Sequence, residues 1–216
     1  MSTIPPRNPA IRHSPAPAGV KHDLRQRGFA FEGYAIVSAD GMIADRNGHM
    51  PEGLKHESDA RFFGAGLDRA ALLVHGRHSH EQQGPVSERR KRLVVTDRIA
   101  GFSVHPSLAN AWVWNPASMP FDQACVKIGV TAGNIAVIGG TGVFGLFLKI
   151  GFAAFHLSRA GKLVLPGGRP VFPEVPTKTP EELLTEHGLK PGPLQVLDPA
   201  EDVTLVSWQH AQAANL

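Results

Sequence analysis

One stretch decides the fold of this chain: Ile135-Ala136-Val137-Ile138-Gly139-Gly140-Thr141-Gly142-Val143-Phe144-Gly145. Four apolar residues of strand length run directly into a glycine-rich turn, and an apolar segment of helical length follows from Val143 to Ile150. The first N–H groups of a helix have no acceptor within the helix, and glycine lets an anion approach them closely. The stretch therefore predicts a strand, a turn and a helix N-terminus that together bind a phosphate group.

Gly140, Gly142 and Gly145 also match the G-x-G-x-x-G pattern of a Rossmann domain. That pattern normally opens its domain, and an acidic residue about 20 positions later holds the ribose. Here the pattern lies two-thirds of the way along the chain, and the next strand ends at His156-Leu157-Ser158-Arg159, without an acid. We therefore expect a cofactor-facing loop in a different α/β fold. Two alternatives stay open: a plain Rossmann protein, and glycines that only permit a tight turn.

A second apolar run, Leu72-Leu73-Val74, ends at His75-Gly76-Arg77-His78-Ser79. Ser79 and Gln82 have the spacing of a capping box, which predicts the start of a short helix. Arg77 would then lie beside a second helix N-terminus, where its guanidinium is a bidentate phosphate donor. This turn is the second predicted anion site.

A third strand-length run ends at Thr96-Asp97-Arg98. Thr96 is a candidate to meet a ribose or phosphate oxygen, and Arg98 is a candidate to pair with a 2′-phosphate. A solvated loop charge is the alternative for Arg98. Three such turns at one edge of one sheet suit a dinucleotide, because its pyrophosphate can lie between two anion sites.

Strand-length and helix-length segments alternate along most of the chain, which predicts an α/β unit with a mostly parallel sheet. An antiparallel hairpin, with strands at 194–197 and 203–208, is expected to close the edge of that sheet. The expected strands are 31–37, 70–74, 93–96, 112–114, 135–138 and 153–157, and the expected helices are 55–66, 121–133 and 143–150.

The domain organisation follows from a change in composition near residue 28. Residues 1–27 are rich in proline and show no hydrophobic period, so we expect a disordered or loosely docked arm. Residues 28–216 are expected to form one domain, because the chain of 216 residues has 42% hydrophobic and 19% charged residues, as ordinary globular proteins do.

Composition also excludes several function classes. The net charge of +3 and the single tyrosine argue against a nucleic-acid partner. No apolar run reaches the roughly 18 residues of a membrane span. The one cysteine, Cys125, forms no intramolecular disulfide, which favours a cytoplasmic location. His75, His78 and His80 lack a paired acid, so we expect no metal site.

These motifs resemble the dihydrofolate-reductase-like superfamily over about residues 29–208. The resemblance is carried by the order of the Gly76-Arg77-His78-Ser79 turn, Thr96-Asp97 and Gly139-Gly140-x-x-Val143-Phe144. The opening Ser38-Ala39-Asp40-Gly41-Met42-Ile43-Ala44 is closer to the reductase domain of bifunctional riboflavin-biosynthesis deaminase-reductases, as is Ser58-Asp59-Ala60-Arg61. The resemblance implies an α/β three-layer fold with a mostly parallel central sheet and the antiparallel C-terminal hairpin.

The resemblance further implies an NADPH-dependent oxidoreductase that forms a homodimer in some members. It implies a cis peptide bond between the paired glycines and a mobile loop, residues 44–51, over the nicotinamide. The NADPH-binding residues that it implies, with those argued from the strand ends, are Gly76, Arg77, His78, Ser79, Thr96, Asp97, Arg98, Gly139, Gly140, Thr141, Gly142, Val143 and Phe144.

The substrate side departs from dihydrofolate reductases, because Glu52 stands after Pro51 where they usually carry tryptophan. We therefore expect a pyrimidine of riboflavin biosynthesis ahead of dihydrofolate or a pterin. Asp59 and Asp40 are the candidate catalytic acids, because a carboxyl buried beside an apolar ring can hold a proton near neutral pH. Ser38, His49 and Arg61 are the candidate substrate contacts.

Each of these acids has a structural alternative: Asp40 as a turn former before Gly41, and Asp59 as a first-turn helix acid. The chain carries no deaminase zinc signature, so we expect a separate reductase domain. A nucleotide-binding domain without catalytic activity, acting as a sensor, remains the alternative of another class.

Overall fold

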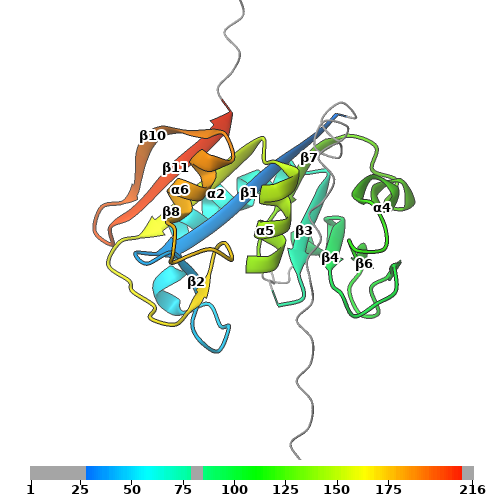
Figure 1. Cartoon of the computed structure of the whole chain (residues 1–216), viewed down its shortest axis with the longest axis horizontal. Coiled ribbons are helices and arrows are strands. Elements are labelled where there is room, and N and C mark those ends of the chain that lie inside the picture. Colours follow the sequence, from blue (N-terminus) through cyan, green and yellow to red (C-terminus); the bar gives the residue numbers. More distant parts are fainter. Residues whose placement is uncertain (1–27, 79–84, 211–216) are drawn as a thin grey trace, which may run out of the picture.

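The computed structural model describes residues 28–78 and 85–210. The described residues form a nine-stranded sheet in the order β10-β11-β8-β1-β7-β3-β4-β6-β5, flanked by helices, and a small sheet of β2 and β9 (Figure 1). The elements are β1 (Phe29–Ser38), β2 (Met42–Ala44), the 3-10 helix η1 (Glu52–Leu54), α2 (Glu57–Asp68), β3 (Leu72–Gly76), α3 (Pro85–Arg89), β4 (Arg92–Val95), β5 (Phe102–Val104), β6 (Ala111–Trp114), α4 (Phe121–Ile128), β7 (Gly133–Val137), α5 (Thr141–Ile150), β8 (Ala154–Ala160), β9 (Arg169–Pro170), α6 (Pro180–Glu186), β10 (Leu189–Asp198) and β11 (Val203–His210).

Most strands of the large sheet are parallel. β1 pairs in parallel with β7 and β8, β3 pairs in parallel with β7 and β4, and β4 pairs in parallel with β6. The C-terminal strands β10 and β11 form an antiparallel hairpin, which joins the sheet through β8. The predicted fold class is therefore confirmed, including the hairpin at the sheet edge.

The layers follow from the alternation of side chains along each strand. On β3, Leu72 and Val74 belong to the large core that also contains residues of α4, α5 and α6, whereas Leu73 packs with α2 on the opposite face. Figure 1 shows α5 and α6 in front of the sheet and α2 behind it. Two helical layers thus enclose the sheet, which is the expected three-layer arrangement.

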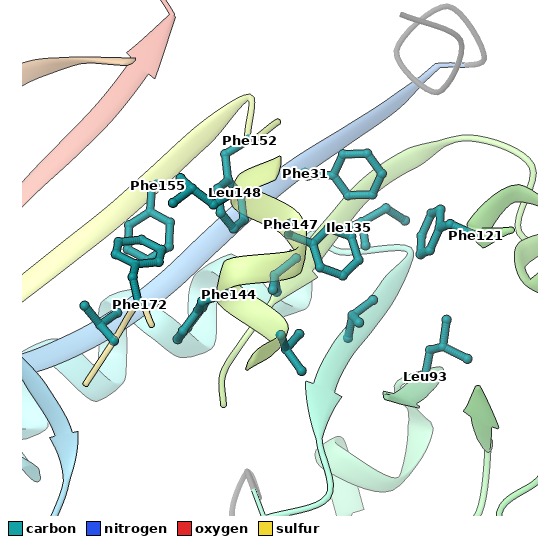
Figure 2. Close-up of a cluster of buried hydrophobic side chains, with 14 of the residues drawn as sticks. Phe31, Leu93, Phe121, Ile135, Phe144, Phe147, Leu148, Phe152, Phe155 and Phe172 are labelled. Carbon is teal, nitrogen blue, oxygen red and sulfur yellow. The ribbon is translucent and has the colours of Figure 1, made fainter. Parts of the chain in front are cut away.

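Phenylalanine rings fill most of the space under α5 (Figure 2). Phe155 of β8 packs edge-to-face on Phe144 of α5 and on Phe152, with ring centroids 5.4 and 5.0 Å apart. Gly33 on the neighbouring strand β1 makes room for this ring, since a Cβ atom there would lie 2.2 Å from Cδ2 of Phe155. The aromatic packing therefore requires glycine at position 33.

We expect the substitution Gly33→Ala to lower the free energy of unfolding by about 2–3 kcal/mol, because the core has no room for the added methyl group. Chemical denaturation of both proteins measures the difference. Gly64→Ala in α2 is the matched control, since its Cβ would meet nothing within 4 Å. The control is expected to be as stable as the parent or more so. Equal stability of the Gly33 variant and the parent would contradict the packing argument.

Several helices differ from the predictions, and the 3-10 helix η1 was not predicted. The predicted helix 121–133 ends early, at Ile128, because Gly129 adopts a left-handed conformation with φ 72° and closes α4. Helix α6 was not predicted, although Thr179 and Glu182 form a capping box at its start, with Pro180 in its first turn. The short strands β2, β5 and β9 were also not predicted.

Candidate functional site

A cavity of about 1230 Å³ opens at the carboxyl ends of β3, β4, β6 and β7 and extends beneath α2. Parallel pairing brings these strand ends to one edge of the sheet, as the sequence predicted. The cavity is lined by three groups of residues: the glycine turn and α5, the ends of β3, β4 and β6, and a pocket between α2 and strands β1 and β8. It is larger than the pockets that hold most single small molecules, so it has room for two.

The glycine turn supplies one wall of the cavity, because Gly139, Gly140, Thr141, Gly142, Val143 and Phe144 all line it. Gly139 and Gly140 have φ angles of 134° and 82°, which other residues rarely adopt. The amides of Val143 and Phe144 donate to the Gly140 carbonyl, which starts α5. The helix N-terminus therefore lies at the cavity wall, where it favours an anion.

The peptide bond between Gly139 and Gly140 is trans, which corrects the cis bond that the family resemblance implied. Within the described residues the cis bond lies elsewhere, between Val175 and Pro176. Positive φ angles at both glycines turn the chain, so the turn forms with a trans peptide bond. The Gly76 amide donates to the Gly139 carbonyl at 3.0 Å and joins the turn to the end of β3.

The other two strand ends contribute side chains to the same cavity. Gly76, Arg77 and His78 follow β3, and Thr96 and Asp97 follow β4, and all five line the cavity. Arg98 does not line it; the Arg98 side chain is exposed, and its backbone amide donates to Thr96 Oγ1 at 3.2 Å. The predicted capping residue Ser79 lies outside the described residues.

Asp59 lies on the first turn of α2 and lines the part of the cavity between α2 and the sheet. Burial raises the pKa of the Asp59 carboxyl above its ordinary value, and the opposing effects of a hydrogen bond with Ser158 and of nearby His56 are smaller. Apolar and aromatic side chains form the walls of this pocket, which explains the loss of water around the carboxyl. They are Tyr34, Ile36, Phe62 and Phe63.

Asp40 does not line the cavity; it stabilises the turn between β1 and β2. Its Oδ1 accepts from Ser38 Oγ at 2.5 Å and from the Leu165 amide at 3.0 Å. Burial alone raises the pKa of Asp40, but these hydrogen bonds and one from its own amide outweigh that effect, so the pKa lies below its ordinary value. Asp40 therefore has the turn-forming place that its structural alternative described.

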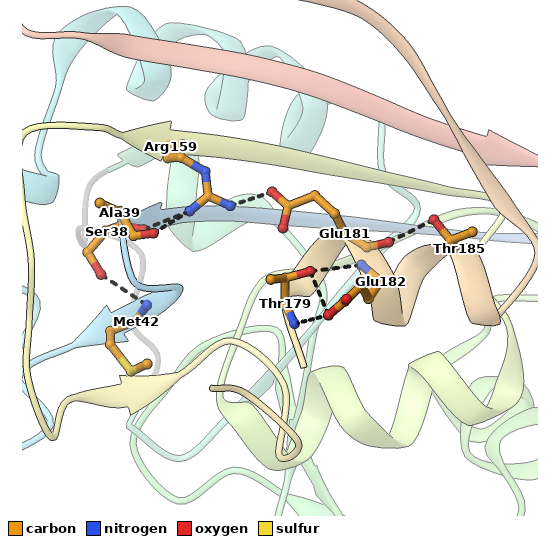
Figure 3. Close-up of polar contacts among 8 residues, drawn as sticks. All are labelled: Ser38, Ala39, Met42, Arg159, Thr179, Glu181, Glu182 and Thr185. Atoms are coloured by element: carbon orange, nitrogen blue, oxygen red, sulfur yellow. Dashed lines mark hydrogen bonds and ion pairs between the residues drawn. The ribbon is translucent and has the colours of Figure 1, made fainter. Parts of the chain in front are cut away.

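Ser38 is fully buried outside the cavity, and its hydroxyl also accepts from the Met42 amide at 3.0 Å. Figure 3 shows this turn beside Arg159 of β8, which donates to the carbonyl oxygens of Ser38 and Ala39 and pairs with Glu181 of α6. The contacts hold the end of β1 in place.

The other two candidate substrate contacts also lie outside the cavity lining. The His49 side chain is exposed, although Gly48 and Met50 on either side line the cavity. Arg61 is exposed on α2 and pairs with Glu57 one turn earlier, at 2.6 Å. The structure therefore gives neither residue a place in the pocket.

The predicted mobile loop 44–51 contributes Ala44, Gly48 and Met50 to the cavity. Asp45 organises it, because its Oδ1 accepts from the amides of Asn47 and His49 at 2.8 and 2.9 Å. Arg169 of β9 also lines the cavity and lies against Gly48, at which an added Cβ would be 2.6 Å from Nε of Arg169.

Sequence reasoning missed several polar residues of the cavity, and three of them bear on the argument below: His156, Ser158 and Arg169. A usable signal existed for two of them. His156 and Ser158 alternate with the apolar residues Phe155 and Leu157, so they share one face of β8. Polar side chains on the half-buried face of a strand are a recognisable pattern, whereas nothing near Arg169 marked it.

No three His, Cys, Asp or Glu side chains within residues 28–78 and 85–210 are grouped so that they could hold a metal ion. Over the same residues, the helices are too short or too polar for any of them to cross a bilayer.

No family model matches the sequence, and no curated protein matches it. Solved structures do. A protein of Shewanella sp. PV-4 described as a riboflavin biosynthesis protein has a TM-score of 0.60 and 18% identity, over 85% of this chain and 99% of that chain. A diaminohydroxyphosphoribosylaminopyrimidine deaminase/5-amino-6-(5-phosphoribosylamino)uracil reductase of Thermotoga maritima has a TM-score of 0.60 and 13% identity, over 87% of this chain and 58% of that chain.

Dihydrofolate reductase of Enterococcus faecalis, complexed with NADP(H), has a TM-score of 0.54 and 16% identity, over 83% of this chain and 95% of that chain. At these identities the likeness concerns the fold. The chain therefore has the dihydrofolate-reductase-like fold, which it shares with structures from riboflavin biosynthesis and with dihydrofolate reductase.

Proposed function

We propose that this protein is an NADPH-dependent reductase of a small heterocycle, with a pyrimidine of the 5-amino-6-(5-phosphoribosylamino)uracil type as its substrate. One observation carries the proposal. A single cavity joins a glycine turn at a helix N-terminus to a buried carboxyl of raised pKa, Asp59. An anion-binding turn beside an aromatic pocket with a proton-holding acid is what hydride transfer from a dinucleotide to a heterocycle requires.

The cofactor would bind at the strand ends. The α5 N-terminus and the glycine turn suit its pyrophosphate, and Arg77 and Thr96 suit the phosphate and ribose of its adenosine half. Bound NADPH supplies the hydride. The protein's own contribution is to hold the two rings together and to keep water out, which the aromatic walls around Asp59 favour.

Asp59 would act on the substrate's polar edge. Because burial raises its pKa, the carboxyl retains a proton at a higher pH than an exposed aspartate does. A protonated Oδ can donate to a ring nitrogen, and the ionised form can accept from amino and imino N–H groups. The Ser158 hydroxyl on β8 orients this carboxyl.

The choice of a phosphorylated pyrimidine rests on cations at the cavity. Arg77, Lys149 and Arg169 line it, and none of the three belongs to the ion pairs found within the described part of the chain. Arg169, beside the loop residue Gly48, is the candidate for the substrate phosphate. Dihydrofolate or a pterin is the second candidate, favoured by the apolar walls beside Asp59 and by the likeness to dihydrofolate reductase.

Steady-state oxidation of NADPH tests the function. The purified protein is assayed with 5-amino-6-(5-phosphoribosylamino)uracil, with related aminouracil phosphates, and with dihydrofolate and dihydropterin. We expect turnover with the phosphorylated pyrimidine, and a higher kcat/KM than with the folates. Tight NADPH binding without turnover of any compound would instead support a sensor domain and overturn the enzyme.

Arg77 is expected to set the preference for NADPH over NADH. The substitution Arg77→Gln should reduce the ratio of NADPH to NADH affinity at least tenfold, because glutamine cannot make the bidentate contact of a guanidinium with the 2′-phosphate. Arg98→Gln is the matched control, since Arg98 is exposed outside the cavity lining. Fluorescence titration of both cofactors measures the ratios. An unchanged ratio in the Arg77 variant would remove this role.

A further inference from the structure

His156 lines the same pocket as Asp59, but it comes from β8 and not from α2. It belongs to β8, where it shares a strand face with Ser158, and it lines the cavity. In the sheet register it lies beside Tyr34 of β1, as Ser158 lies beside Ile36. The pocket is thus bounded by these strands on one side and by Asp59 and the aromatic residues of α2 on the other.

Three contacts fix the plane of the His156 imidazole. Its Nδ1 is hydrogen-bonded to Ser207 Oγ of β11 at 2.8 Å. Its ring stacks on Tyr34, with centroids 4.7 Å apart and planes inclined by 28°, and Phe62 of α2 packs against its edge at 5.2 Å. These contacts use the ring face and Nδ1, and the structure shows no hydrogen bond to Nε2 from any residue that it describes.

We propose that Nε2 of His156 is a hydrogen-bonding point for a flat heterocyclic substrate whose other polar edge meets Asp59. This inference rests on the proposed function and narrows its substrate class. A ring that forms hydrogen bonds with both His156 and Asp59 needs polar atoms on two edges, as aminopyrimidinones, aminouracils and pterins have. A flat ring with one polar edge leaves either His156 or Asp59 without a hydrogen-bond partner, and such a buried polar group costs free energy of binding.

The surroundings of the imidazole favour its neutral form, in which Nε2 can either donate or accept a hydrogen bond. Burial lowers the pKa of His156, nearby Arg69 adds to that effect, and Glu32 opposes it. A neutral imidazole presents either a donor or an acceptor at Nε2, according to which nitrogen holds the proton. The Ser207 hydroxyl can donate to Nδ1 or accept from it, so the pair can offer Nε2–H to a carbonyl or a lone pair to an amino group.

The test compares His156→Phe with His156→Gln in the full-length protein saturated with NADP⁺. Phenylalanine keeps the ring packing against Tyr34 and removes the polar atom, whereas glutamine restores a donor and an acceptor. Calorimetric titration with pterin and with 5,6-diaminouracil measures binding without relying on turnover. We expect the phenylalanine variant to bind both probes at least tenfold more weakly, and the glutamine variant to recover most of the affinity.

Two controls separate this role from a structural one. The affinity for NADP⁺ should be unchanged in both variants, and His187→Phe should bind the probes like the parent, since His187 lies outside the cavity lining and bonds the Leu183 carbonyl. Parental probe affinity in the His156→Phe protein would overturn the proposal, as would equal losses in both variants. Probe binding that depends on His156 without NADPH oxidation would refute the reductase function alone, and failure of the parent to bind either probe would overturn both.

Discussion

Replacing Asp59 with asparagine is expected to lower kcat for NADPH-dependent reduction by about 10²–10⁴-fold, the usual contribution of a positioned acid or base. Asparagine has nearly the same shape but cannot lose or transfer a proton. Because Asp59 lies on α2, away from the glycine turn, the dissociation constant of NADPH should stay the same. Single-turnover kinetics with the phosphorylated pyrimidine measures the rate, and fluorescence titration measures cofactor affinity.

The pH dependence gives an independent check of the same residue. The rate with the parent protein should fall as the pH rises through the Asp59 pKa, which burial raises above its ordinary value, and the variant should lack this limb. When the pKa of a carboxyl is higher in the folded than in the unfolded state, the free energy of unfolding of the protein falls as the pH rises through that pKa. The variant should therefore gain stability relative to the parent as the pH rises. A parental pH profile in the variant would exclude Asp59 as the acid.

Asp40→Asn is the matched control for this experiment. Asp40 was a candidate acid from sequence, but its Oδ1 holds the β1–β2 turn through Ser38 and Leu165. Asparagine keeps an Oδ1 that can accept both hydrogen bonds. The control should therefore retain the parental rate and pH profile.

The strand ends and the glycine turn that line the cavity could be predicted from the sequence, because local patterns determine them. An apolar run followed by glycines is a strand, a turn and a helix start wherever it lies, and parallel pairing then brings the ends of β3, β4 and β7 together. Gly76, Thr96 and Gly140 line one cavity for this reason. The isomer of the Gly139–Gly140 bond was predicted wrongly, since two glycines can make such a turn with positive φ angles instead.

The part of the cavity around Asp59 depends on contacts between distant segments, which sequence patterns do not show. Ser38 and Asp40 stand in a conspicuous motif, yet both serve the turn that Arg159 also holds. Two polar residues that line the same cavity as Asp59 come from β8, about 100 positions later. Their place follows only from the register of β1 with β8, which fixes the strand face they share.

Replacing Gly140 with alanine is expected to weaken NADPH binding at least tenfold. Gly140 immediately precedes α5 with φ 82° and ψ 128°, a conformation that costs other residues about 1–3 kcal/mol. To relieve this strain, the turn must shift the first amides of α5, whose orientation toward an anion provides the affinity. Since hydride transfer follows binding, kcat at saturating NADPH should fall less than kcat/KM for the cofactor.

Gly167→Ala separates strain from cofactor binding. Gly167 also has a positive φ, 70°, its Cβ would meet nothing within 4 Å, and it lies outside the cavity lining. Both variants should therefore lose stability to a similar extent in chemical denaturation, whereas only the Gly140 variant should lose NADPH affinity. Equal cofactor affinity in the two proteins would mean that the dinucleotide phosphates bind away from α5. The shared cavity would then no longer connect cofactor and acid, and the reductase mechanism would have to be abandoned with it.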